Sequence, residues 1–334
     1  MTLAVSIIIP NYNHAKFLQQ RIESVLSQTY QNFEVIILDD YSTDNSREII
    51  ESYREHEKIA HIVYNTENSG STFKQWNKGV ELAKGIYIWI AESDDYANVR
   101  FLSLCLKKFD KNPKLGIVYT DSYEVNDENL IAGRWSRWQE RLTQNLWTKS
   151  FSEIGNQINS HYNYIANVIP NASCTVFKKG LYLDSIFKNH VETLKYTGDW
   201  ITWFSILMDA DLCYCHLPLN YFRFHTNTTR YRADLRLSNI AEQYDALRIF
   251  KNSCITNGDK KIEKERFNEI FSIWNPKLRD LFFVQHRSIL KQGLIVDKLL
   301  VIKLFQTSLK RLLHSIVSLI KVSYPFALLK RNKI

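Results

Sequence analysis

YIWIAESDD, residues 87–95, joins a run of aromatic and β-branched residues to three carboxylates within four positions. The run 86–91 is typical of a buried strand, and Glu92, Asp94 and Asp95 follow where it ends. Carboxylates this close repel one another and are costly to desolvate, so we expect a positive partner among them. A divalent cation that holds a phosphate is one candidate. A solvated acidic turn that caps the next helix is the alternative.

The same design, an apolar strand that ends in polar residues, occurs twice before this stretch. An apolar run at 4–10 leads into a polar loop at 11–13, and a second run at 33–38 leads into 39–44. The carboxyl ends of parallel strands meet at one edge of a sheet, where ligands bind. We therefore expect the three polar loops to converge.

Strand and helix signals alternate over the first 120 residues. Strands are expected at 4–10, 33–38, 60–64, 86–91 and 116–120, and helices at 17–27, through 49–50, and at 72–83 and 98–109. This alternation predicts an α/β fold with a mostly parallel sheet flanked by helices. Neither a G-x-G-x-x-G nor a Walker sequence is present, which argues against a dinucleotide-binding fold or a P-loop ATPase.

The alternation stops in residues 121–170, whose aromatic and polar residues suit either sugar binding or a packed subdomain. Ordered segments return at 169–177, 201–208, 212–214 and 221–225. We predict a catalytic domain over 1–230, with halves of about 1–120 and 121–230. A helical region with a basic amphipathic tail is expected over 231–334.

Composition and charge narrow the class of protein. Five cysteines without paired spacing indicate reduced thiols and a cytoplasmic location, and no signal peptide is expected. The net charge is +8, but residues 287–334 hold ten Lys or Arg against one acid, Asp297. That segment alone carries +9, which leaves the rest near −1. The basic excess is thus local, which argues against nucleic-acid binding by the whole surface.

The segment 287–334 also has helical periodicity. Apolar residues recur every three or four positions at Val301, Phe305, Leu309, Leu312, Ile316 and Leu319. No uncharged apolar run reaches the ~18 residues of a spanning helix. The segment is expected to lie on an anionic membrane surface, peripheral to the inner face of the cytoplasmic membrane. The alternative is a helix packed on the catalytic domain or on a second subunit of a homo-oligomer.

In their order along the chain, these segments resemble family 2 of the nucleotide-sugar glycosyltransferases, the inverting family with a GT-A fold. The matching pieces are VSIIIPNYN (5–13), IESVLSQTY (22–30), DDYSTD (39–44), NSG (68–70), NKG (77–79) and ESDD (92–95). The resemblance covers residues 3–228 and implies a donor half followed by an acceptor half. It departs from the family at Glu92, where Asp is usual, and at FKQWN (73–77), which replaces an Ala-Arg-Asn pattern.

The resemblance implies a set of nucleotide-sugar-binding residues. They are Pro10, Asn11, Tyr12, Asp39, Asp40, Lys74, Ser93 and Asp94. The first three would line the base and ribose, Asp40 would accept a hydrogen bond from the base with Asp39 nearby, and Lys74 would face a phosphate. For residues 39–44 the alternative is helix capping alone.

The resemblance also implies a metal site for Mn²⁺ or Mg²⁺. Asp94 and Asp95 would hold the ion against the diphosphate, with Glu92 in support, and the ion would offset charge on the leaving nucleoside diphosphate. His225, which ends YFRFH (221–225), would approach the metal or the diphosphate. The alternative for this histidine is a structural role.

Asp199 is our choice of general base, because it lies in GDW (198–200), where the family places its catalytic carboxylate. An inverting displacement needs one base to take the proton of the attacking hydroxyl. The alternative is an N-cap for the helix 201–208. The acceptor side would include Asn171, Ser173, Trp200 and Trp203. The two tryptophans suit a core role equally well.

The expected function is therefore an inverting, metal-dependent glycosyltransferase. It would move a sugar from a nucleotide-diphosphate donor, UDP-type first, to a hydroxyl of a glycan or lipid-linked acceptor in bacterial surface polysaccharide biosynthesis. A catalytically inactive sugar-nucleotide-binding or scaffold protein is the alternative, against which the intact Asp94, Asp95 and Asp199 argue.

Overall fold

The computed structural model describes residues 3–140, 142–143, 145–164, 166–169 and 171–225, together with nine positions between 239 and 253. These residues belong to one compact unit, Met1–Cys254. The basic amphipathic tail 287–334 and most of the predicted helical region lie outside the described residues.

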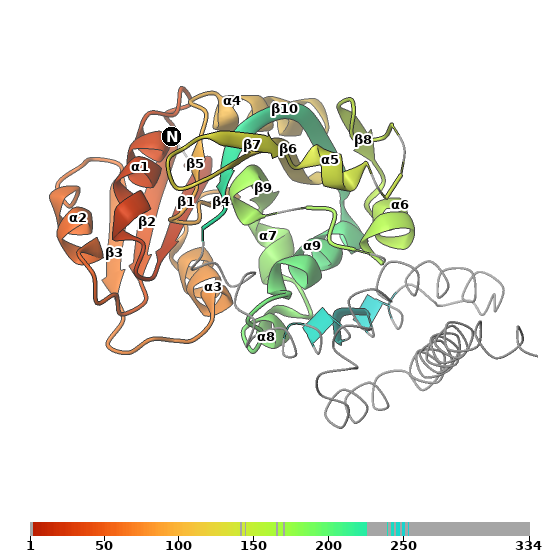
Figure 1. The fold of residues 1–334 in the computed structure, drawn as a ribbon. Helices are drawn as coiled ribbons and strands as arrows, with labels where there is room; N and C mark the ends of the chain where they lie inside the picture. Colours follow the sequence, from red (N-terminus) through yellow and green to blue (C-terminus); the bar gives the residue numbers. More distant parts are fainter. Residues whose placement is uncertain are drawn as a thin grey trace, which may run out of the picture. The chain divides into compact units, whose positions relative to one another are not determined.

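A sheet with the strand order β3-β2-β1-β4-β9-β6-β10-β5 forms the centre of this unit (Figure 1). Its strands are β1 Val5–Asn11, β2 Phe33–Asp39, β3 Ile59–Tyr64, β4 Tyr87–Ile90, β5 Tyr96–Ala97, β6 Leu115–Val125, β9 Thr175–Lys178 and β10 Asp211–Arg223. Two more, β7 Ile131–Arg134 and β8 Phe151–Glu153, pair with β6 and β10. β1 to β4 run parallel, as do β6 and β10, while β9 runs antiparallel between β4 and β6. The predicted mostly parallel sheet is confirmed.

Helices cover both faces of the sheet (Figure 1). The longer helices are α1 Ala15–Leu26, α2 Ser46–Ser52, α3 Thr72–Leu82, α4 Phe101–Lys111 and α9 Gly198–Asp209. Shorter ones are α5 Ser136–Gln139, α6 Gly155–Ile158, α7 Lys179–Leu183, α8 Lys188–Val191, the π-helical η1 Asn159–Asn163 and the 3₁₀ turn η2 Ala172–Cys174. The expected helices 17–27, 72–83 and 98–109 correspond to α1, α3 and α4.

The alternation of side chains along β1 explains how both faces are covered. Ile7 and Ile9 pack in one core with Leu18 of α1 and Phe101 of α4. Ile8 points to the opposite face, where Gly79 of α3 lies so close that an added Cβ would be 2.5 Å from the Ile8 side chain. All seven residues of β1 are therefore buried, as expected for a parallel strand between two helical layers.

The two long strands, β6 and β10, differ from the sequence prediction. β6 continues to Val125 instead of ending near residue 120, because residues 121–125 pair with β10 and residues 123–125 pair with β7. The buried Asp121 in this extension forms an ion pair with Arg134 at 2.7 Å. The segments expected at 212–214 and 221–225 are one strand, β10, interrupted by register shifts around Pro218. Polar residues and a proline inside a strand hide its continuity from the hydrophobic pattern.

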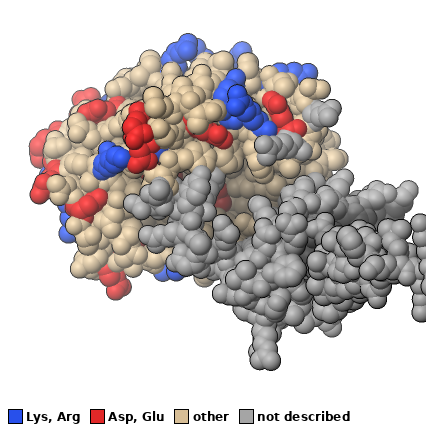
Figure 2. Space-filling model, viewed as in Figure 1, with Lys and Arg blue, Asp and Glu red and all other residues tan. Residues whose placement is uncertain are grey.

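The surface charge and the helix lengths of the described residues concern binding to charged partners and to membranes. On the face drawn in Figure 2, acidic and basic side chains of the described residues are interspersed. Within the described part of the chain, no helix has both the length and the apolar character needed to cross a membrane.

Candidate active site

The polar loops that follow β1, β2 and β4 meet at one edge of the sheet. Asn11 pairs with Asp39 in the register of β1 and β2, and its Nδ2 donates to Asp39 Oδ1 at 3.0 Å. His14, in the loop after β1, forms a hydrogen bond of 2.8 Å through Nδ1 with Ser93 Oγ in the loop after β4. The parallel topology thus brings these loops together, as the sequence predicts.

Two buried arginines lie among the carboxylates of the loop after β4. Arg21 of α1 places Nη2 3.9 Å from Asp95 Oδ2 and donates from Nε to the Glu92 carbonyl at 2.8 Å. Arg223, at the end of β10, donates from Nε to the Asp94 carbonyl at 2.8 Å. Burial lowers the pKa of Arg21 to about 10, against the opposing charges of Asp95 and Asp94, so it stays charged at neutral pH. The chain itself therefore supplies part of the positive charge expected among the three carboxylates.

The three carboxyl groups differ in pKa. Burial, reinforced by the charge of Asp94, raises the pKa of Glu92 to about 8 and that of Asp95 to about 7. Burial also acts to raise the pKa of Asp94, but the hydrogen bond from His225 and the charges of His14 and His225 hold it at about 2. Negative charge is thus concentrated on Asp94.

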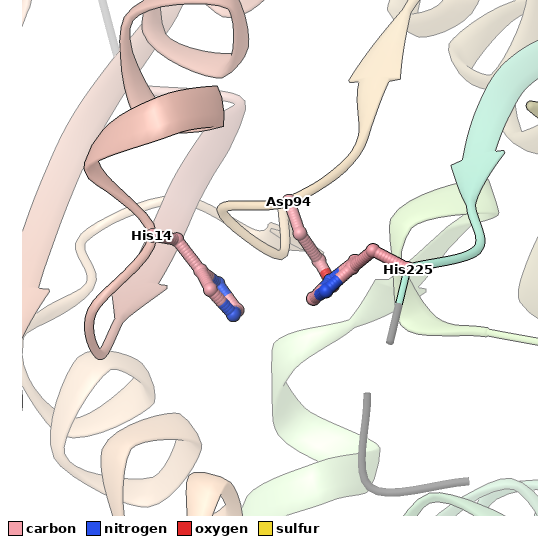
Figure 3. A group of neighbouring side chains, drawn as sticks. All are labelled: His14, Asp94 and His225. Atoms are coloured by element: carbon pink, nitrogen blue, oxygen red, sulfur yellow. The ribbon is translucent and has the colours of Figure 1, made fainter. Parts of the chain in front are cut away.

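His14, Asp94 and His225 point toward one another (Figure 3), and one ligand atom from each lies within 4.8 Å of the others. His225 Nε2 lies 3.1 Å from Asp94 Oδ2. The contact between His14 Nδ1 and Ser93 leaves Nε2 of that ring available as a ligand. Two imidazole nitrogens and one carboxylate oxygen fit Mn²⁺ better than Mg²⁺, which prefers oxygen ligands throughout.

The structure gives Asp95 and Glu92 other contacts. Asp95 is buried and accepts hydrogen bonds from the Arg223 N–H at 2.9 Å and from Asn171 Nδ2 at 3.4 Å. Glu92 Oε1 accepts a hydrogen bond from Trp76 Nε1 at 2.9 Å. Of the four residues assigned to the metal from the sequence, Asp94 and His225 are therefore brought together with His14, while Asp95 and Glu92 face neighbouring protein groups.

The donor-side aspartates organise the loops around them. Asp40 Oδ1 accepts hydrogen bonds from Asn65 Nδ2 at 2.6 Å and from Gln75 Nε2 at 2.9 Å. Asp39 Oδ2 accepts from the Ser42 N–H at 3.1 Å and from Arg47 Nε at 3.2 Å. Neither carboxylate caps α2, whose first residue instead donates to Asp44 at 3.0 Å.

The remaining donor-side residues line the same rim. Pro10 and Asn11 are buried in β1, whereas the side chain of Tyr12 is 46% exposed. Lys74 is exposed and donates from Nζ to the carbonyl of Ser69 at 3.1 Å. Ser69 also donates to Asp40, so Lys74 lies beside the loop that this aspartate holds.

Asp199 lies in the first turn of α9. Its Oδ2 accepts a hydrogen bond from Asn167 Nδ2 at 3.0 Å, and its Oδ1 accepts one from the Trp200 N–H at 2.7 Å. The preceding Gly198 packs so tightly against Phe73 that an added Cβ would lie 2.6 Å from the ring. Helix α3 of the donor half therefore fixes the point at which the candidate base enters α9.

The four residues predicted for the acceptor side are all buried. Trp200 and Trp203 are 3% and 0% exposed, which fits a core role. Ser173 Oγ accepts hydrogen bonds from Arg21 Nη2 and from the Glu92 N–H, both at 3.1 Å. With Asn171 on Asp95, this contact ties η2 to the carboxylate loop.

Four residues near the site were not identified from the sequence: His14, Arg21, Asn167 and Arg223. Arg21 could have been identified from the sequence, because it lies on the apolar face of α1 among Phe17, Leu18, Ile22 and Val25. A charged residue on such a face is costly unless it is paired, so its position indicates a buried acidic partner. The polar run that ends in His14 indicates a loop, but nothing in that pattern identifies His14 as a candidate metal ligand.

Known proteins resemble this chain in sequence and in fold. Residues 6–181 match the model of Glycosyl transferase family 2. Chondroitin synthase of Pasteurella multocida is 36% identical over 144 residues, which is 43% of this chain and 15% of the relative. The chain thus spans a small part of that protein.

Two solved structures share the fold. TarS of S. aureus in complex with UDP-GlcNAc has a TM-score of 0.62 at 18% identity, over 89% of this chain and 82% of TarS. The mannosyltransferase PcManGT of Pyrobaculum calidifontis, in complex with GDP-Man and Mn²⁺, has a TM-score of 0.52 at 17% identity, over 92% and 80%. The fold is of the GT-A type. With a family match that covers more than half of its length, the chain belongs to glycosyl transferase family 2.

Proposed function

We propose that this enzyme transfers a sugar, with inversion, from a UDP-type donor to a hydroxyl of a glycan or lipid-linked acceptor in bacterial surface polysaccharide biosynthesis. The observation that carries this proposal is the convergence of His14, Asp94 and His225 at the sheet edge where nucleotides bind in such folds. TarS with UDP-GlcNAc and the mannosyltransferase with GDP-Man and Mn²⁺ support a nucleotide-sugar donor.

The three ligands would hold Mn²⁺, which when bound offsets the negative charge of the departing nucleoside diphosphate. Asp199 would act from the acceptor half. As the acceptor oxygen forms its bond to C1 of the sugar, the bond from C1 to the diphosphate oxygen breaks, and the hydroxyl proton passes to Asp199. The hydrogen bond from Asn167 to Asp199 Oδ2 would orient the carboxylate for this transfer.

Donor binding and transfer should separate in two variants. Wild type, Asp94→Asn and Asp199→Asn are incubated with a panel of UDP- and GDP-sugars and Mn²⁺, and nucleotide binding is measured apart from UDP or GDP release. Asp199→Asn is expected to bind like wild type and to lose turnover, whereas Asp94→Asn loses Mn²⁺-dependent binding. Full turnover by Asp199→Asn, or wild-type turnover in the presence of a chelator, would refute the mechanism.

We also propose that the segment 287–334, which lies outside the described residues, binds an anionic membrane surface and brings the enzyme to a lipid-linked acceptor. The support is its net charge of +9 with a helical apolar stripe. Flotation with anionic vesicles is measured for the full chain and for a chain that ends at residue 286. Equal partitioning of the two forms would contradict membrane binding by this segment.

A further inference from the structure

Three consecutive backbone N–H groups converge on the carboxylate of Glu242. Oε1 accepts a hydrogen bond from Lys195 at 2.8 Å, and Oε2 accepts from Tyr196 at 2.7 Å and from Thr197 at 3.1 Å. Hydrogen bonds to an ionised carboxylate are short and strong, and three of them hold a loop in one conformation. Glu242 lies outside both the family match and the catalytic domain predicted over 1–230.

The loop that Glu242 holds leads directly into α9. Thr197 is the N-cap residue of that helix, and its own side chain makes no capping bond there. The Glu242 carboxylate thus lies beside the positive end of α9, where a negative charge is favourable. On its other side the loop is tied to the donor half, because Ser71 Oγ donates to the Leu194 carbonyl at 2.5 Å.

The chain around Glu242 is also packed against α9. The ring of Phe250 stacks on Phe204 with centroids 4.0 Å apart and meets Trp200 edge-on at 5.1 Å. Phe250 has no exposed surface, and Asp245 lies 2.6 Å from His190 of α8. The packing of Phe250, which is independent of the loop, therefore places Glu242 where it is, whereas the partly exposed Asp245–His190 pair contributes little.

We propose that Glu242 is a positioning residue for the transfer reaction. Its carboxylate fixes residues 195–197 and thereby the carboxylate of Asp199, two residues further along. This inference rests on the proposed role of Asp199 as the base. A misplacement of about 1 Å at a reacting group costs on the order of a hundredfold in rate, so the loss of three anchoring bonds should lower turnover without weakening donor binding.

The test compares Glu242→Ala, Glu242→Gln and the matched control Asp245→Asn. The control removes the ion pair with His190 from the same segment but leaves the loop contacts. Turnover is followed as release of nucleoside diphosphate from the nucleotide sugar that wild type uses fastest. Glu242→Ala should lower kcat by about ten- to a hundredfold with KM for the donor within about twofold. Glu242→Gln, which keeps one acceptor oxygen, should have a kcat between those of Glu242→Ala and wild type. Asp245→Asn should keep the wild-type kcat.

Amide hydrogen exchange gives a readout that does not depend on turnover. Glu242→Ala should speed exchange in a peptide that covers 192–200, while Asp245→Asn should not. Unchanged exchange, or a kcat equal to that of the control, would overturn the role of Glu242. The double variant Glu242→Ala/Asp199→Asn should be no slower than Asp199→Asn alone, because both act through one carboxylate. If Asp199→Asn keeps full turnover, the proposed base fails instead, whatever Glu242 does.

Discussion

The backbone N–H of Arg223 donates a hydrogen bond to Asp95 Oδ1 at 2.9 Å. This bond joins the end of β10 to the loop after β4. Asp94 precedes Asp95 by one residue and His225 follows Arg223 by two, so the bond holds two of the candidate metal ligands in register. Through this bond Asp95 connects the two segments that carry Asp94 and His225.

We expect Asp95→Ala and Asp94→Asn to fail in different ways. Asp95→Ala leaves the Arg223 N–H without its acceptor and breaks the buried ion pair with Arg21 from one side. It should therefore lower the free energy of unfolding by about 3–5 kcal/mol and weaken Mn²⁺ binding indirectly. Asp94→Asn should abolish Mn²⁺-dependent UDP binding and, because Asn keeps an oxygen that can accept from His225, cost only about 1–2 kcal/mol. Urea denaturation and calorimetric titration measure the two effects. Equal stability losses in both variants would contradict this division of roles.

Arg21→Met should be among the most destabilising substitutions in the chain. It removes the buried cation beside Asp95 and the donors to the Glu92 carbonyl and Ser173. Breaking a buried pair from one side costs about 3–5 kcal/mol, which urea denaturation would register. The control is Arg54→Met. Because Arg54 pairs with Glu51 at the surface, this variant should lose little of its free energy of unfolding. Similar unfolding midpoints for the two variants would count against a structural role for Arg21.

His14→Ala should weaken Mn²⁺-dependent UDP binding by about tenfold or more and should leave folding intact. The reason is the position of this ring opposite Asp94 and His225. The exposed His56 offers the matched control, and His56→Ala should bind like wild type. Because the donor set holds two imidazoles, Mn²⁺ should also support tighter binding than Mg²⁺ in wild type. A His14→Ala variant with unchanged Mn²⁺ affinity would remove this residue from the ligand set.

Gly198→Ala should lower both stability and turnover. The new Cβ would lie 2.6 Å from the Phe73 ring, so either Phe73 or the start of α9 must shift, at a cost of about 1–3 kcal/mol. Gly180 in α7 has nothing within 4 Å of an added Cβ. Gly180→Ala should therefore be neutral or stabilising by up to about 1 kcal/mol. Thermal unfolding and kcat separate the two variants, and equal behaviour would show that the contact with Phe73 is compliant.

The sequence correctly predicted the helices and strands that are determined by the pattern of apolar residues within the segment itself. The apolar run 33–38 became β2, and the spacing of 72–83 became α3, because hydrophobic periodicity reports which face is buried. The direction of β9 was not predictable, since the sequence of a four-residue strand does not indicate its orientation. The single long β10 was missed because Pro218 interrupts its pattern.

The residues of the candidate site likewise fall into those that the sequence predicted and those that it did not. Asp94, Asp199 and His225 belong to ordered motifs, which made them candidates. Arg21 and Arg223 both contact Asp95, which is 74 positions from Arg21 and 128 positions from Arg223 in the sequence. Long-range pairs of this kind depend on the tertiary arrangement, which one sequence does not show. Glu242 lies beyond the matched motifs, so no pattern pointed to it.

The ligand group is spread over almost the whole described chain, and this has a consequence for biosynthesis. His14 follows β1, whereas His225 follows β10, the last strand among the described residues, and β10 must pair with β6 before His225 can meet Asp94. A nascent polypeptide that has not yet released β10 from the ribosome lacks one of the three ligands. Under the proposed Mn²⁺ role, cation affinity at this group would be acquired only after β10 has joined the sheet, so Mn²⁺ binding would distinguish a finished sheet from a partly folded one.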